Sequence, residues 1–243
     1  MEPVEYEALA ENETQFWWHR TLRDILWAEL RKWVRVSPSC WVDVGCGIGG
    51  ALKAFQDKGM AGGIGCDFSG HAARFWIRRR PGPVCRADGN ALPFRNGAAD
   101  LTLNTDVICC AEIDPPRLLG ELSRVLKKGG FLFLTTPAYQ SLCSAHDRAV
   151  HCVRRFRRQA LTAAIRQNGF EILRDTYLFP TLFPFLAVHR LLTKRKQVEK
   201  SEVRMPARFL NEALYWMLGW ERLWLRCFNF AFGSTILIVA RKV

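Results

Sequence analysis

The feature that most constrains this chain is a glycine-rich loop that follows a short apolar run. Residues 42–50 read Val-Asp-Val-Gly-Cys-Gly-Ile-Gly-Gly, and a segment with helical character follows directly at 50–58. Glycine suits such a loop because it has no Cβ, so the backbone turns tightly and a ligand can approach it closely. The amides at a helix N-terminus then offer hydrogen-bond donors to that ligand. The pattern predicts a strand, a ligand-binding turn and a helix, which is the first unit of a parallel sheet.

Apolar runs and helical segments alternate along most of the chain. The predicted strands cover 40–44, 63–67, 84–87, 101–105, 130–136, 171–178 and 235–241. The predicted helices cover 11–35, 50–58, 69–80, 115–126 and 157–168. Such alternation favours an α/β fold in which helices cover both faces of one parallel sheet. The stretch 179–232 breaks the alternation, because it is helix-like and rich in Trp, Phe and Leu.

The length and composition predict one domain. A chain of 243 residues corresponds to about 1.6 domains of roughly 150 residues. We expect a single domain over 1–243, made of an N-terminal helical cap (1–37), a ligand-binding core (38–178), a helical insertion (179–232) and a last strand (233–243). Apolar residues make up 49% of the chain and charged residues 24%, which excludes wholesale disorder. The acidic first residues and nine irregularly spaced cysteines predict a cytoplasmic protein with reduced thiols.

The glycine loop alone is compatible with two cofactor classes. Gly45, Gly47 and Gly50 satisfy the G-x-G-x-x-G fingerprint of dinucleotide-binding proteins, and Asp67 lies at a suitable spacing for a ribose contact. A nucleotide-dependent oxidoreductase is therefore one alternative.

Further motifs favour a different family. Asp43 stands two residues before the first glycine, and this arrangement resembles the first motif of the class I S-adenosylmethionine-dependent methyltransferases. Asp67 then resembles the family's acid for the ribose hydroxyls, and Asp88 resembles its acid for the adenine amino group. Residues 124–130 resemble the turn before the fifth strand. Four matches in family order favour the methyltransferase. The resemblance implies a doubly wound, Rossmann-like, seven-stranded sheet with an antiparallel last strand, and S-adenosylmethionine as cofactor.

The resemblance also predicts which residues bind the cofactor. They are Trp18, Asp43, Gly45, Cys46, Gly47, Gly49, Asp67, Phe68, Ser69, Asp88, Gly89, Asn104 and Thr105. Trp18 is included because the N-terminal helix covers the cofactor in many relatives, and an aromatic face next to a sulfonium is favourable. Packing of Trp18 against the sheet is the alternative. The chain departs from many relatives at Cys109-Cys110, where they carry Glu-His.

Two residues after the fifth predicted strand are candidates for catalysis. His146 and Asp147 belong to the loops at the carboxyl ends of the strands, which line the ligand crevice of such sheets. A His beside an Asp can titrate near neutral pH, so we predict that this pair is catalytic. The alternative is that both residues anchor a loop or cap a helix. We predict no metal, because the nearby Cys and His residues lack the spacing of a structural zinc site.

The acceptor is predicted to be a small molecule or lipid-like. Residues 177–188 are almost wholly apolar, and cations follow up to Lys196. This pattern predicts that Tyr177–Lys196 contacts the inner membrane surface peripherally, since cations near anionic headgroups favour binding. Trp216, Trp220 and Trp224, spaced four residues apart, would extend that surface. Burial of the apolar run against the sheet is the alternative.

Two other functions stay open. The net charge of +12 implies attraction to polyanions, and the basic Arg154–Arg158 stretch would suit a tRNA or rRNA methyltransferase. The chain carries no recognisable RNA-binding module, which makes nucleic acid the second choice. The third hypothesis is a non-catalytic binding protein that retains the cofactor fold.

Overall fold

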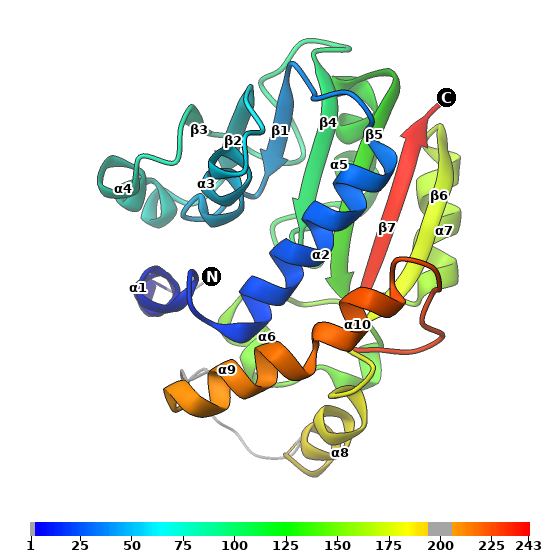
Figure 1. The fold of residues 1–243 in the computed structure, drawn as a ribbon. Coiled ribbons are helices and arrows are strands. Elements are labelled where there is room, and N and C mark those ends of the chain that lie inside the picture. The colour runs from blue at the N-terminus through cyan, green and yellow to red at the C-terminus, as the bar shows by residue number, and fades with distance from the viewer. Residues whose placement is uncertain (1–2, 194–205) are drawn as a thin grey trace.

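A central sheet organises the chain (Figure 1). The computed structural model describes residues 3–193 and 206–243. In these ranges seven strands form one sheet in the order β3-β2-β1-β4-β5-β7-β6. The strands are β1 (Trp41–Val44), β2 (Gly63–Asp67), β3 (Val84–Arg86), β4 (Ala99–Thr105), β5 (Leu126–Pro137), β6 (Phe170–Leu178) and β7 (Thr235–Lys242).

The strand directions confirm the predicted doubly wound fold. Strands β1 to β5 pair in parallel, whereas β7 runs antiparallel to both β5 and β6. The chain order reverses between β1 and β4, which lie side by side in the sheet. In open α/β sheets the carboxyl ends of the strands at such a reversal leave a crevice for a ligand. The fold therefore predicts a binding site beyond the ends of β1 and β4.

Helices cover both faces of the sheet and its carboxyl edge. They are α1 (Pro3–Asn12), α2 (Trp17–Trp33), α3 (Gly50–Asp57), α4 (Gly70–Arg79), α5 (Pro115–Val125), the 3₁₀ turn η1 (Gln140–Leu142), α6 (Ala145–Ala149), α7 (Arg158–Gln167), α8 (Phe183–Thr193), α9 (Arg208–Met217) and α10 (Gly219–Trp224). Helix α2 crosses in front of the sheet and α7 lies behind it (Figure 1). Helices α1, α6, α8 and α9 gather beyond the carboxyl ends of the parallel strands.

The core lies on both sides of the central strands. All four residues of β1 are buried, as expected for a parallel strand that helices cover on both faces. Helix α2 contributes one apolar stripe, in which Leu22, Ile25 and Leu26 are at most 3% exposed. This buried stripe follows the helical spacing of three to four residues and fixes α2 against the sheet.

The first helical region differs from the prediction of one helix over 11–35. The structure ends α1 at Asn12 and begins α2 at Trp17. The side chain of Asn211, on α9, explains the break, because its Oδ1 accepts from the Trp17 amide at 2.9 Å and its Nδ2 donates to the Gln15 carbonyl at 2.8 Å. A residue nearly two hundred positions away therefore sets the start of α2, and the local pattern of apolar residues does not contain that information.

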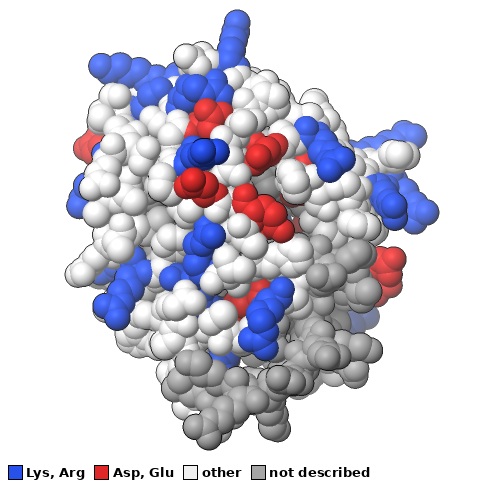
Figure 2. Space-filling model, turned by 180° about the vertical axis from the view of Figure 1, so that it is seen from behind, with Lys and Arg blue, Asp and Glu red and all other residues white. Residues whose placement is uncertain are grey.

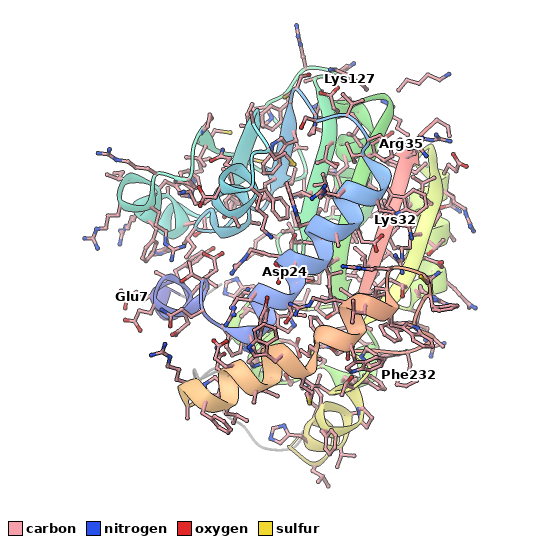
Figure 3. All side chains as sticks on the ribbon, in the orientation of Figure 1. Glu7, Asp24, Lys32, Arg35, Lys127 and Phe232 are labelled. Carbon is pink, nitrogen blue, oxygen red and sulfur yellow. The ribbon has the colours of Figure 1, made fainter. Side chains whose placement is uncertain are left out.

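The helices between β6 and β7 pack on the first part of the chain. Asp24, on α2, is labelled in Figure 3, and its Oδ2 accepts from Tyr215 Oη at 2.7 Å and from Arg222 Nη1 at 2.9 Å. The buried Glu221 accepts from the Thr181 amide at 2.9 Å. The contacts of Asp24 join α9 and α10 to α2, and the contact of Glu221 joins α10 to the segment before α8. The predicted division of the chain at residues 37, 178 and 232 stays a prediction.

Candidate functional site

A large cavity opens at the carboxyl ends of the parallel strands. Its volume is about 1230 Å³, and its lining comes from α1, α2, the glycine loop, the end of β4, α6 and α8. Pockets for one small molecule typically measure about 300–1,000 Å³. The cavity is therefore larger than a typical pocket for one small molecule.

Most of the predicted site residues come together in this cavity. Those that line it are Trp18, Asp43, Gly45, Cys46, Gly47, Asp67, Phe68, Ser69, Gly89, Thr105, His146 and Asp147. Gly49, Asp88 and Asn104 are not part of the lining, although Asp88 and Asn104 are next to lining residues in the chain. Asp88 is exposed, and its Oδ1 accepts from the Asn90 amide at 2.8 Å. The roles of all these residues in binding or catalysis stay predictions.

The glycine loop is shaped for a close approach to its backbone. Gly45 has a φ of +81°, and a Cβ there would stand 2.0 Å from Val107 Cγ2. Gly47 has a φ of +53°, and among the described residues no heavy atom lies within 4 Å of where its Cβ would be. A side chain is thus excluded at Gly45 by crowding, whereas the space at Gly47 stays open to a ligand. Glycine is needed at both positions because other residues rarely adopt this backbone region.

Asp67 ties the glycine loop to the end of β2. Its Oδ2 accepts from the Gly47 amide at 2.8 Å, and its Oδ1 accepts from the Ser69 amide at 2.9 Å. Burial raises the pKa of Asp67, and the two amide hydrogen bonds oppose that rise. The carboxylate is therefore fixed at the cavity wall, where it can still accept from ligand hydroxyls through its remaining lone pairs.

Asp43 is a buried acid of the site with a carboxylate oxygen that accepts no hydrogen bond from the described residues. It is 2% exposed, and its Oδ2 has no hydrogen-bond partner in the described part of the chain. Burial, followed by the negative charges of Asp67 and Glu13, raises the pKa of Asp43 to about 7. Buried acids of this kind are stabilised by a cation or a donor. Asp43 thus fits a ligand that brings a positive charge to the glycine loop.

The N-terminal segment closes over the loop through Glu13. A Cβ on Gly50 would stand 1.9 Å from Glu13 Oε1, so only glycine permits this approach. Arg79, on α4, donates from Nη1 to Glu13 Oε2 at 2.6 Å and from Nη2 to the Ala10 carbonyl at 2.7 Å. Glu13 is a functional candidate that the sequence pattern does not reveal, since Arg79 lies 66 residues away.

Trp18 packs on an aromatic residue at the cavity wall, and its contact with the cofactor stays a prediction. It lines the cavity, and its ring stacks on that of Phe179 with centroids 6.0 Å apart and planes at 30°. Phe179 is buried at the end of β6. The contact joins α2 to the residue that follows β6.

Asp106 is a further acid that the sequence reasoning missed. It follows β4 directly, lines the cavity and has a φ of +57°. Its Oδ1 accepts from Thr135 Oγ1 at 3.1 Å. Burial raises the pKa of Asp106 to about 6, against the lowering effect of the Thr135 hydrogen bond and of Arg155. Its place at the end of the fourth predicted strand was a usable signal. A carboxyl of this pKa can accept a proton near neutral pH.

His146 and Asp147 share the short helix α6 but have different surroundings. Asp147 Oδ2 accepts from the amide and the hydroxyl of Ser144 at 2.6 and 2.8 Å, which forms a capping box. Burial disfavours the charge of Asp147, but the charges of Arg155 and Arg190 outweigh it and lower its pKa. Asp147 thus anchors the loop, which was the alternative to catalysis. Burial lowers the pKa of His146, so this residue is neutral at pH 7 and able to accept a proton.

The Arg154–Arg158 stretch is not one solvent-facing patch. Arg155 is 8% exposed, and Arg154 donates to the Ile113 carbonyl. Figure 2 shows Lys and Arg spread over separate parts of one face, with Asp and Glu gathered near its centre. This distribution weighs against a continuous phosphate-binding surface on that face.

The helices after β6 expose many apolar side chains. The exposed ones are Phe185, Val188, Leu192, Phe209, Leu210, Trp216, Met217, Trp220, Leu223 and Trp224. Of the predicted interfacial segment, Tyr177 and Phe179 are buried, whereas Phe185 is 76% exposed. Residues 194–196 lie outside the described residues. In the part of the chain that the structure describes, no helix is long and apolar enough to cross a membrane.

Known methyltransferases resemble this chain in sequence over a region that includes the glycine loop. A family model described as a methyltransferase domain matches residues 42–134. The 24-methylenesterol C-methyltransferase 2 of Oryza sativa subsp. japonica is 30% identical over 169 residues, which are 59% of this chain and 45% of that protein. The chain thus spans less than half the length of this relative.

Solved structures share the fold across almost the whole chain. One is a chain from the complex between the Haloferax volcanii Trm112 methyltransferase activator and a methyltransferase, with a TM-score of 0.64, 20% identity and coverage of 99% of this chain and 93% of that chain. Another is geranyl diphosphate C-methyltransferase from Streptomyces coelicolor A3(2), with a TM-score of 0.60, 20% identity and coverage of 89% and 78%. At this identity the likeness establishes the fold alone.

Proposed function

We propose that this chain, which belongs to the class I S-adenosylmethionine-dependent methyltransferases, transfers a methyl group from that cofactor to a small-molecule or lipid-like acceptor. The observation that carries the proposal is the Asp43 carboxyl, buried beside the glycine loop with one oxygen unpaired among the described residues. S-adenosylmethionine bears an ammonium and a sulfonium group, so it would supply a positively charged partner for the Asp43 carboxylate.

The residues present fit this cofactor. Bound S-adenosylmethionine supplies an electrophilic methyl group on a positively charged sulfur. The open backbone at Gly47 would receive it, Asp43 would hold its ammonium and Asp67 would accept from its ribose hydroxyls. The loop amides and the start of α3 would add further donors. Trp18 and Phe68 offer aromatic faces to the same cavity.

The chain itself contributes alignment and exclusion of water. A displacement at a methyl group needs the attacking atom held in line, and this positioning provides much of the rate enhancement. Glu13 and Arg79 hold the N-terminal segment over the loop, with the Arg79–Glu13 distance at 2.6 Å. The Trp18–Phe179 stack joins the start of α2 to the residue that follows β6. These contacts support a site that closes around its ligands.

Two residues are candidates for the base that an acceptor with an exchangeable proton would need. Asp106 has a pKa raised to about 6, and His146 is neutral at pH 7. Both line the cavity. We propose Asp106 as the base, because it follows the central strand β4 and burial raises its pKa to about 6, near neutral pH.

A largely apolar acceptor is supported by the other lining of the cavity. Leu182, Phe185 and Leu186, from the start of α8 and its approach, line it. The names of the rice relative and of the Streptomyces structure refer to a sterol and to geranyl diphosphate, and both compounds contain a large hydrocarbon part. The exposed apolar side chains of α8 to α10 support peripheral contact with a lipid surface.

Binding calorimetry with S-adenosylmethionine, S-adenosylhomocysteine and NAD⁺ tests the proposal. We expect the first two ligands to bind and NAD⁺ not to bind. Binding of NAD⁺ without S-adenosylmethionine would overturn the proposal in favour of the oxidoreductase. Binding of S-adenosylmethionine without methyl transfer into any cell fraction would favour the non-catalytic alternative.

A further inference from the structure

Two guanidinium groups share one carboxylate in the wall of the cavity. Arg155 Nη2 donates to Asp147 Oδ1 at 2.6 Å, and Arg190 Nη1 donates to Asp147 Oδ2 at 3.2 Å. All three residues line the cavity. They come from different elements, since Asp147 lies on α6, Arg190 on α8 and Arg155 in the segment between α6 and α7. The fold thus brings two cations together, and among the described residues Asp147 is the one acid that bridges them.

Arg155 has hydrogen-bonding capacity that the described chain does not use. Its side chain is 4% exposed. Nη1 donates to the Ala138 carbonyl at 3.0 Å, but the buried Nε has no hydrogen-bond partner among the residues described. A buried donor on a charged group is costly to leave unpaired, so such a donor in a cavity wall indicates a missing acceptor.

The positive charge of Arg190 is also only partly balanced, because Arg190 shares the Asp147 carboxylate with Arg155. Its side chain is 13% exposed, and Nη1 donates to the Leu142 carbonyl at 2.9 Å. Burial, followed by the positive charge of Arg155, lowers the pKa of Arg190. Asp106 is a further acid within electrostatic reach of Arg155, but its described hydrogen bond goes to Thr135 and not to a guanidinium.

Apolar side chains also line this cavity. Phe179, Leu182, Phe185 and Leu186 belong to its lining. Phe179 is buried, whereas Phe185, on α8, is 76% exposed. The cavity therefore combines two cations with an apolar wall that reaches the molecular surface.

We propose that the methyl acceptor has an apolar body and an anionic oxygen group, a carboxylate or a phosphate, which Arg155 and Arg190 bind. Guanidinium groups match both anions through paired N–H donors, and these charge-assisted hydrogen bonds are strong. Asp147 is a positioning residue that holds the two side chains in place. This inference rests on the proposed function, because it assigns the acceptor of the same site.

The experiment uses the full chain saturated with S-adenosylhomocysteine. Octyl phosphate, octanoate and octanol are titrated into it by calorimetry, so that the apolar chain is constant and the head group changes. We expect the better of the two anions to bind at least about tenfold more tightly than octanol, which corresponds to about 1.4 kcal/mol. The stronger of the two anions then identifies the head group as phosphate or carboxylate.

Two variants and a matched control test the residues. Arg190→Gln leaves Asp147 paired with Arg155, and it should weaken anion binding about tenfold or more while S-adenosylhomocysteine binding stays unchanged. Arg155→Lys keeps the positive charge but loses the Nε donor, and it should weaken binding of the same anion. Arg148→Gln removes an exposed charge of α6 outside the cavity lining, and it should leave anion binding unchanged.

The outcomes separate this inference from the proposed function. Equal binding of octanol and both anions would overturn it, as would an equal loss in Arg148→Gln and Arg190→Gln. If S-adenosylhomocysteine itself fails to bind the wild-type chain, the proposed function fails. The anions titrated into the unliganded chain would then still decide whether the two arginines form an anion site.

Discussion

Replacement of Asp43 by Asn should affect stability and cofactor binding in opposite directions. Asp43 is buried next to the glycine loop, and its pKa is raised from 3.8 to about 7. Each pH unit corresponds to about 1.4 kcal/mol, so ionised Asp43 costs the ligand-free fold on the order of 4 kcal/mol. The amide of Asn has nearly the same shape and carries no charge, so the variant lacks this cost.

The sign of the effect depends on pH. The unfolded chain releases the Asp43 proton near its ordinary pKa of 3.8, whereas the folded chain retains it up to about pH 7. The folded wild-type chain therefore loses stability as the pH rises from about 4 to about 7, because Asp43 becomes ionised in its buried position. The Asn variant does not lose this stability. The difference in the free energy of unfolding between the Asn variant and the wild type should be greatest above about pH 7. The part of it that comes from the Asp43 charge should vanish below about pH 4. The cost of burying the Asn amide is constant with pH and leaves this difference in slope unchanged.

Urea denaturation of both proteins at about pH 5 and about pH 8 measures the stability difference. Calorimetry with S-adenosylmethionine at about pH 8 measures the loss of affinity, for which about 1.5–3 kcal/mol is the usual range for a hydrogen bond to a charged group. A stability difference that does not change with pH would refute the raised pKa. Unchanged cofactor affinity would refute the role of Asp43 in binding.

Three further predictions concern the other parts of the site. Asp67→Ala should lower cofactor affinity by about 1.5–3 kcal/mol in calorimetry, because it removes a fixed acceptor; unchanged affinity would remove Asp67 from the cofactor site. Asp106→Asn should lower turnover by ~10²–10⁴ with unchanged cofactor affinity, whereas His146→Ala should lose tenfold or less; the reverse order would make His146 the base. The chain should co-sediment with anionic but not neutral vesicles, and Phe209→Ser with Trp216→Ser should weaken this, since both side chains are largely exposed; a failure to co-sediment with anionic vesicles would exclude the lipid contact.

The sequence predicts the sheet and the glycine loop well because both depend on local patterns. The alternation of apolar runs and helical segments predicts the parallel strands, and the family resemblance implies the antiparallel last strand, which the structure pairs with β5 and β6. Gly45 and Gly47 have positive φ, as a tight ligand-binding turn requires. These features need no knowledge of distant contacts.

Contacts between distant residues could not be predicted in the same way. Glu13 reaches Arg79 across 66 positions, and Arg190 reaches Asp147 across 43. The basic Arg154–Arg158 stretch suggested a surface, but the fold turns Arg155 inward to an acid eight residues away. Charge runs in a sequence do not indicate which side chains face solvent, because that depends on tertiary packing.

Transfer of a labelled methyl group from S-adenosylmethionine tests the central claim most directly. The wild-type chain is incubated with the labelled cofactor and cell extract, and lipid, small-molecule, RNA and protein fractions are counted separately, with Asp43→Asn as the control. The proposed function predicts label in the lipid or small-molecule fraction, with much less label from the variant. Label confined to the RNA fraction would favour the tRNA or rRNA methyltransferase over the proposed function. An absence of label from every fraction would contradict a methyltransferase activity.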